Sequence, residues 1–187
     1  MTTIIKIKSS DFNTQFLKEF QEKYSDRDIE ISISPSKKSL LDEALFWEII
    51  GCLDWEQEED ENIIKSAIQK LATYPIHYIY LFQDILSEKL YLLDTKEYAL
   101  YIGEDSWKKG TYFSVDNFLY TRCCVVANGK EAYETILNNP SEMPKDLTFE
   151  PLLSLASEAY QLKTGKIFNY SGVFNFETYS NEKGWLK

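Results

Sequence analysis

Apolar side chains recur at helical spacing along most of this 187-residue sequence, and that periodicity constrains the fold more than any other feature. The first such stripe consists of Leu40, Leu41, Ala44, Leu45, Trp47, Ile49 and Leu53, and the next of Ile63, Ile64, Ala67, Ile68 and Leu71. Only 7 Gly and 5 Pro interrupt the chain. The pattern therefore predicts a mostly α fold, a multi-helix orthogonal bundle.

Cap and breaker residues mark the ends of the later helices. They are Pro75 at the first position of a third helix, Asp94 before a short helix at 98–102, Ser114 before 115–127, Asn139-Pro140 after 132–137, and Thr164-Gly165 after 149–162. Residues 123–126 also have strand propensity, which leaves a strand as the alternative there.

The N-terminal residues follow a different pattern. Residues 3–8 and 28–34 alternate apolar and polar side chains, as half-buried strands do. Between them Phe12, Phe16, Phe20 and Tyr24 recur at helical spacing after Asp11, a residue that suits a helix N-cap. We therefore expect a small β-α-β appendage over residues 1–36, which makes the chain α+β overall.

The remaining residues divide into a helical domain over 39–166 and an aromatic-rich C-terminal tail over 167–187. The tail contains Phe174, Phe176 and Trp185, side chains that are common in interface cores. Two interpretations stay open. The tail binds a partner through these three residues, or it folds back over the helices of its own domain.

Charge excludes one class of function and suggests another. The chain has 20 basic and 30 acidic residues, hence a net charge of −10, which is the reverse of a nucleic-acid-binding surface. Residues 41–70 contain 2 basic and 9 acidic groups, a net charge of 2 − 9 = −7. Within them, five carboxylates form a dense run, namely Glu56, Glu58, Glu59, Asp60 and Glu61. Such a local field attracts a basic partner, although it also suits a solvated helix connection.

Localisation is predicted from the absence of familiar signals. The first residues alternate in polarity and resemble no signal peptide, and no apolar run approaches the roughly 18 residues of a membrane span. The three cysteines, Cys52, Cys123 and Cys124, lack metal-site or disulfide-framework spacing. We expect a soluble cytoplasmic protein with reduced thiols, no membrane contact and no cofactor.

The order of several short motifs resembles a bacterial family catalogued as domain of unknown function 4240. The motifs are Phe46-Trp47 with Ile49-Ile50, the segment Ser114 to Arg122, Gly129, Asn139-Pro140, and Ala159-Tyr160 with Thr164-Gly165. The similarity spans roughly residues 44–166. It implies a mostly helical domain whose biochemical activity is not established.

One family element, S-D-D-G-F-x-x-F-R, is partly kept as Ser114, Asp116, Phe118 and Arg122. These polar residues form a candidate ligand pocket below the loop at 103–110, in which Arg122 would hold a phosphate or carboxylate. The structural alternative is that Ser114 caps a helix, Asp116 favours its dipole and Arg122 pairs with a carboxylate of a neighbouring helix.

Catalytic and metal-binding signatures are missing. His77 is the only histidine and has no nucleophile at a fixed spacing, and the acidic run lacks the glycine and alternating oxygen ligands of a calcium loop. We therefore assign no catalytic and no metal-binding residue.

Three functions remain for such a chain. The first is a protein-binding domain, best exemplified by an immunity or antitoxin-like protein whose acidic surface occludes a basic toxin. The second is a small-molecule sensor or enzyme that uses a pocket around Arg122 and Asp116. The third is a scaffold that oligomerises through its aromatic residues. The sequence fixes neither the partner nor the oligomeric state.

Overall fold

The computed structural model describes residues 14–24 and 39–186. The chain divides into two units, Met1–Ser36 and Lys37–Lys187. In the first unit, helix α1 (Thr14–Tyr24) aligns the rings of Phe16, Phe20 and Tyr24 along one face, with centroids 5.5 and 4.7 Å apart. The two strands predicted beside this helix lie outside the described residues, and no strand occurs within the described ranges.

The second unit is a helical bundle, which confirms the mostly α prediction. Its helices are α2 (Ser39–Ile50), α3 (Asp60–Ile63), α4 (Lys65–Thr73), α5 (Ile76–Leu92), α6 (Lys96–Ala99), α7 (Val115–Ala127), α8 (Lys130–Asn138), α9 (Leu155–Thr164) and α10 (Glu182–Trp185). Two short 3₁₀ helices, η2 (Pro140–Glu142) and η3 (Glu150–Ser154), lie between α8 and α9.

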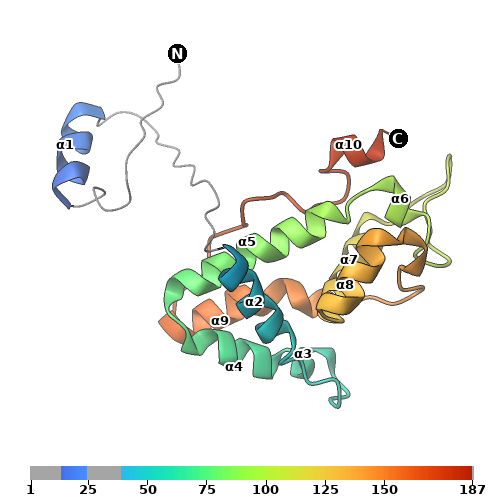
Figure 1. Ribbon diagram of the computed structural model, residues 1–187, viewed down its shortest axis with the longest axis horizontal. Helices are drawn as coiled ribbons and strands as arrows, with labels where there is room; N and C mark the ends of the chain where they lie inside the picture. Colours follow the sequence, from blue (N-terminus) through green and yellow to red (C-terminus); the bar gives the residue numbers. More distant parts are fainter. Residues whose placement is uncertain (1–13, 25–38, 187) are drawn as a thin grey trace. The chain divides into compact units, whose positions relative to one another are not determined.

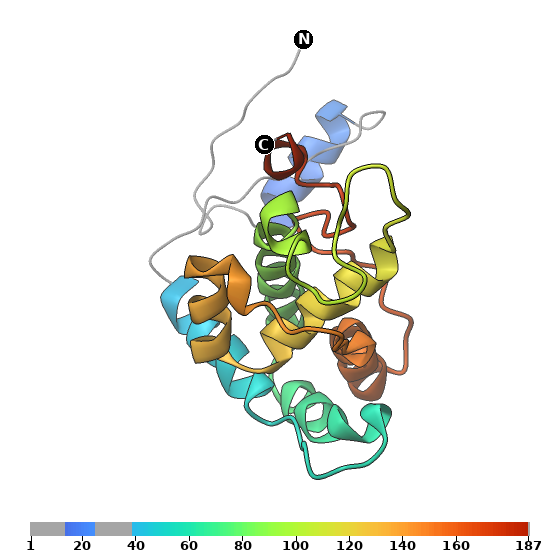
Figure 2. The ribbon, with the colours of Figure 1, turned by 90° about the vertical axis from the view of Figure 1, so that its right-hand side faces the viewer.

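Helix α5 is the centre of this bundle. It packs against α2, α4, α7 and α9, and Figures 1 and 2 show these helices gathered around it. Its apolar stripe is fully buried because Ile79, Leu86 and Leu90 point into the core. These three residues recur at the spacing from which the helix was predicted.

Local signals predicted from the sequence mark the start of α7 and the end of α9. The Ser114 hydroxyl accepts a hydrogen bond from the Asn117 amide at 3.2 Å, which confirms Ser114 as the N-cap of α7. Gly165 ends α9 in the left-handed conformation, with φ 68°. The strand alternative at 123–126 is wrong, because α7 continues through these buried residues.

Two predicted boundaries differ. The helix expected over 149–162 begins as the 3₁₀ turn η3, which contains Pro151, and becomes α-helical only at Leu155. Asp94 does not cap the following short helix. Thr95 precedes α6, and the Asp94 carboxylate is engaged by the C-terminal tail instead.

Candidate functional site

Arg122 of α7 is fully buried and donates hydrogen bonds to helix α5 and to the tail. Its Nη1 donates to the carbonyl oxygens of Leu90 and Phe176, both at 2.9 Å, and its Nη2 donates to the Thr178 hydroxyl at 2.9 Å. Nη2 also lies 4.0 Å from Oδ1 of Asp94, a carboxylate that is itself fully buried. The guanidinium therefore ties α5, α7 and the tail together.

Burial and a nearby negative charge shift the pKa of this guanidinium in opposite directions. Removal from water lowers the pKa of Arg122 to about 10, and the nearby Asp94 carboxylate opposes that shift. Arg122 thus stays charged at neutral pH. Its guanidinium carbon also lies 4.7 Å from the centroid of the Phe118 ring, a cation–π contact on the same helix.

Asp94, in the turn between α5 and α6, accepts four hydrogen bonds from the tail. Its Oδ1 accepts from the Tyr179 amide at 3.1 Å and from Nε1 of Trp185 at 3.0 Å. Its Oδ2 accepts from the Asn181 amide at 2.9 Å and from the Ser180 hydroxyl at 3.2 Å. A buried carboxylate with this many donors is well compensated for its lost hydration.

We call residues 168–186 the C-terminal strap. Its aromatic side chains face its own domain: the Trp185 ring lies 5.8 Å from Phe118 and 6.0 Å from Phe113, centroid to centroid. Phe176 also packs on the core, whereas Phe174 stacks on Tyr91 and keeps 36% of its surface exposed. In the structure the strap folds back over the helices, so Phe176 and Trp185 are not free for a partner.

Gly172 allows the strap to lie close to α5. Its φ is 86°, and a Cβ at this position would lie 2.7 Å from Oγ of Ser87 and 3.0 Å from the carbonyl oxygen of Gln83. The Ser87 hydroxyl in turn accepts a hydrogen bond from the Phe174 amide at 3.2 Å. A side chain at residue 172 would therefore push the strap off the helix.

We predict that Gly172→Ala lowers the free energy of unfolding by about 1–3 kcal/mol more than Gly110→Ala, measured by urea denaturation. Gly110 is a matched control because its φ is 82° but nothing lies within 4 Å of its Cβ position. Both substitutions strain the backbone, and only the first creates a clash. Equal losses of unfolding free energy in the two variants would show that the close approach of the strap at Gly172 does not contribute to the effect of the substitution.

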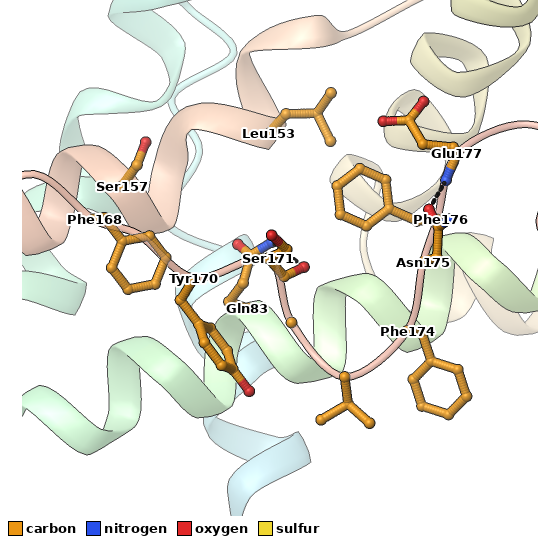
Figure 3. A pocket seen from close by; sticks show the side chains of 12 residues that line it. Gln83, Leu153, Ser157, Phe168, Tyr170, Ser171, Phe174, Asn175, Phe176 and Glu177 are labelled. Carbon is orange, nitrogen blue, oxygen red and sulfur yellow. Dashed lines mark hydrogen bonds between the residues drawn. The ribbon is translucent and has the colours of Figure 1, made fainter. Parts of the chain in front are cut away.

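A cavity of about 640 Å³ lies between the strap, α5 and the η3–α9 region (Figure 3). Its walls are formed by Gln83, Leu153, Ser157, Phe168, Tyr170, Ser171, Gly172, Val173, Phe174, Asn175, Phe176 and Glu177. Beside it, the Tyr170 hydroxyl donates to the Asp84 carboxylate at 2.6 Å, and burial raises the pKa of both groups, that of Tyr170 to about 12.

The structure places Ser114, Asp116 and Arg122, the residues of the candidate pocket, in different surroundings. Ser114 caps α7, Asp116 is exposed on its first turn, and Arg122 is buried with its Nη atoms bound to protein groups. None of the three lines the cavity described above. Their positions agree better with the structural interpretation. Ser114 caps a helix, and the carboxylate near Arg122, that of Asp94, comes from another part of the fold.

The acidic run covers the end of the loop between α2 and α3 and the first turn of α3, which contains Asp60 and Glu61, and all five of its carboxylate residues are exposed. Within the described residues, no salt bridge joins any of them to a cation. Trp55 directly precedes the run and exposes 51% of its surface, with its ring 5.1 Å from that of Phe149. Trp55 is not among the residues predicted to bind a partner, because no local sequence pattern indicates its exposure.

Other candidate chemistry is sparse. Among the described residues, no cluster of three or more His, Cys, Asp or Glu has the arrangement of a metal site. His77 is exposed at the start of α5. Burial raises the pKa of the Cys123 thiol to about 12, so that thiol is unreactive at neutral pH. In the part of the chain that the structure describes, no helix combines the length and apolarity needed for a membrane span.

The fold and its strap define a helical domain with a buried Arg–Asp pair that holds an extended C-terminal segment. Residues 41–162 match the model of a family described as a protein of unknown function (DUF4240), and the chain belongs to that family. The resemblance seen in the sequence is thereby confirmed. The match includes Asp94 and Arg122 but not the strap. Searches of curated proteins and of solved structures find no match.

Proposed function

We propose that this chain is a bacterial, cytoplasmic protein-binding domain of the immunity or antitoxin kind, which captures a basic partner such as a toxin. The binding surface is the acidic loop, residues 54–61. One observation carries the proposal: the half-exposed Trp55 stands beside five exposed carboxylates that no described cation neutralises. The three free thiols fit a reducing compartment.

Hydrogen bonds brace the acidic loop internally and at its base. The Asp54 carboxylate accepts from the Glu56 amide at 3.2 Å and from Nε2 of Gln57 at 2.8 Å. The Asp54 amide donates to the carbonyl oxygen of Ile63 at 3.0 Å, which closes the loop at its base. A loop ordered before binding loses little conformational entropy when a partner docks, and this supports a role in recognition.

Charge and an aromatic anchor have different effects on binding. Long-range attraction by the carboxylates raises the association rate of a basic partner and weakens with salt. Tryptophan is enriched among residues whose removal costs the most binding energy, so Trp55 would slow dissociation once the partner is seated. The loop thus combines the two components of a fast and tight complex.

The first test neutralises part of the loop. In the variant Glu56→Gln, Glu58→Gln, Glu59→Gln the net charge changes from −10 to −10 + 3 = −7. We expect the association rate of the captured partner to fall about tenfold at low salt and much less at high salt. The measurement is affinity capture from a lysate of the source bacterium with quantitative mass spectrometry, followed by surface plasmon resonance on the purified partner.

A matched control distinguishes the effect of the acidic loop from the effect of the net charge of the chain. The variant Glu97→Gln, Glu104→Gln, Glu131→Gln also has a net charge of −7 but neutralises exposed residues on other elements. It should bind the partner as the parent chain does, while Trp55→Ala should raise the dissociation rate about tenfold or more. A partner with no basic excess, or one lost equally from both charge variants, would contradict the proposal.

A further inference from the structure

The cavity under the C-terminal strap has the size of a small-molecule site. Its volume is about 640 Å³, within the range of roughly 300–1,000 Å³ that is usual for such sites. It is built from three separate parts of the chain, α5, the η3–α9 region and the strap. The strap is fixed above it by Arg122, through the Phe176 carbonyl oxygen, and by Asp94.

Aromatic and aliphatic side chains form one part of the cavity wall, and polar groups form the other. In Figure 3, Phe168 and Ser157 lie on one side of the space, Phe176 and Glu177 lie on the other, and Leu153 lies between them. Such walls suit a flat apolar body, because ring faces and a leucine side chain provide contact area without hydrogen-bonding groups.

The charge of the wall selects the sign of the ligand. Glu177 is the only charged residue among the lining residues, none of which is Lys, Arg or His. No hydrogen bond or salt bridge within the described residues engages the Glu177 carboxylate, whose amide donates to Oδ1 of Asn175 at 3.1 Å. The negative charge of Glu177 favours the charged form of Arg122 and so raises the pKa of its guanidinium, but the Nη groups of Arg122 already donate hydrogen bonds to other partners.

The polar groups beside Glu177 also suit a ligand that donates hydrogen bonds. Gln83 is buried, and its Nε2 reaches only the carbonyl oxygen of Ser171, at 3.5 Å. Serine hydroxyls at 157 and 171 and the Ser171 carbonyl oxygen can accept from an ammonium group. No lining residue offers an anion a cationic partner, and an anion would also be repelled by the net charge of −10.

We propose that this cavity binds a small organic cation with a flat apolar body, its ammonium group against Glu177 and its body between Phe168 and Phe176. The site is separate from the acidic loop and does not depend on the protein partner. Cations interact favourably with aromatic faces as well as with carboxylates, so both parts of the wall act on the same ligand.

The test uses three indoles of similar shape with the full chain. Tryptamine is a cation at neutral pH, tryptophol is its neutral counterpart, and indole-3-acetate is an anion. By isothermal titration calorimetry we expect tryptamine to bind about tenfold more tightly than tryptophol, with no measurable binding of indole-3-acetate. Equal affinity for all three, or no binding of tryptamine at millimolar concentration, would overturn the proposal.

Two variants and a control test whether the ligand binds in this cavity. Glu177→Gln should remove the preference for tryptamine over tryptophol, whereas Glu182→Gln, which neutralises an exposed carboxylate of the strap outside the cavity, should keep it. Ser157→Trp should fill the cavity and abolish binding of both compounds, with circular dichroism confirming a retained helical fold. Equal weakening by the two glutamine variants, or tryptamine binding unaffected by Ser157→Trp, would show that the chain attracts cations without this site.

Discussion

Replacing Asp94 by alanine is expected to lower the free energy of unfolding by about 3–5 kcal/mol, among the largest effects of any single substitution in this chain. The change leaves the buried charge of Arg122 without its carboxylate and removes the acceptor of four strap hydrogen bonds. Urea denaturation followed by far-ultraviolet circular dichroism measures the loss. Glu97→Ala, at an exposed residue of α6, should change stability by less than about 0.5 kcal/mol.

A double-mutant cycle tests whether the buried pair is the cause. Arg122→Met removes the charge and keeps an apolar stem of similar length. The double variant Asp94→Ala, Arg122→Met should be more stable than the sum of the two single losses predicts, by about 1–3 kcal/mol, because no uncompensated charge remains. Strict additivity would mean that Asp94 and Arg122 act independently, and that the strap hydrogen bonds alone account for the Asp94 effect.

The sequence predicts the helical bundle because its signals are local. A stripe such as Ile79, Leu86 and Leu90 repeats within one helix, and its spacing holds whatever the helix packs against. The Ser114 cap is equally local, since the hydroxyl and the amide that it accepts from are three residues apart. These features were therefore predicted correctly.

The site depends on contacts between residues far apart in the chain, which no local pattern reveals. Asp94 resembles an N-cap in the sequence, but its donors lie 85–91 residues later. Arg122 likewise binds Phe176 and Thr178, which are 54 and 56 residues away. Before α10 the strap shows no helical periodicity, and the Phe174, Tyr179 and Asn181 amides donate to the side chains of Ser87 and Asp94.

The strap is bound through its main chain as well as through its side chains. Arg122 donates to the Phe176 carbonyl oxygen, Ser87 accepts from the Phe174 amide, and Asp94 accepts from two further amides. Such contacts require an extended backbone in the right place and impose few demands on sequence. Side chains add specificity at Thr178 and Trp185.

Deleting residues 167–187 is therefore expected to lower the free energy of unfolding by about 3–6 kcal/mol, the second large effect. The deletion exposes the rings of Phe113 and Phe118 that Trp185 now covers, and it opens Asp94 and Arg122 to water. Urea denaturation of the shortened chain measures the loss. A stability within about 1 kcal/mol of the full chain would mean that the strap is an accessory to the fold.

The deletion can be reversed in trans if the strap binds as the structure shows. A synthetic peptide of residues 167–187 should restore the stability of the shortened chain in a concentration-dependent way, because ligands that bind only the folded state stabilise it. Trp185→Ala in the peptide should weaken binding about tenfold or more, since it removes the hydrogen bond to Asp94 and two ring contacts. Ile167→Ala, at a residue that is 81% exposed, should leave binding unchanged. Equal effects of the two peptide substitutions would contradict docking through Asp94, because of these two residues only Trp185 donates to that carboxylate.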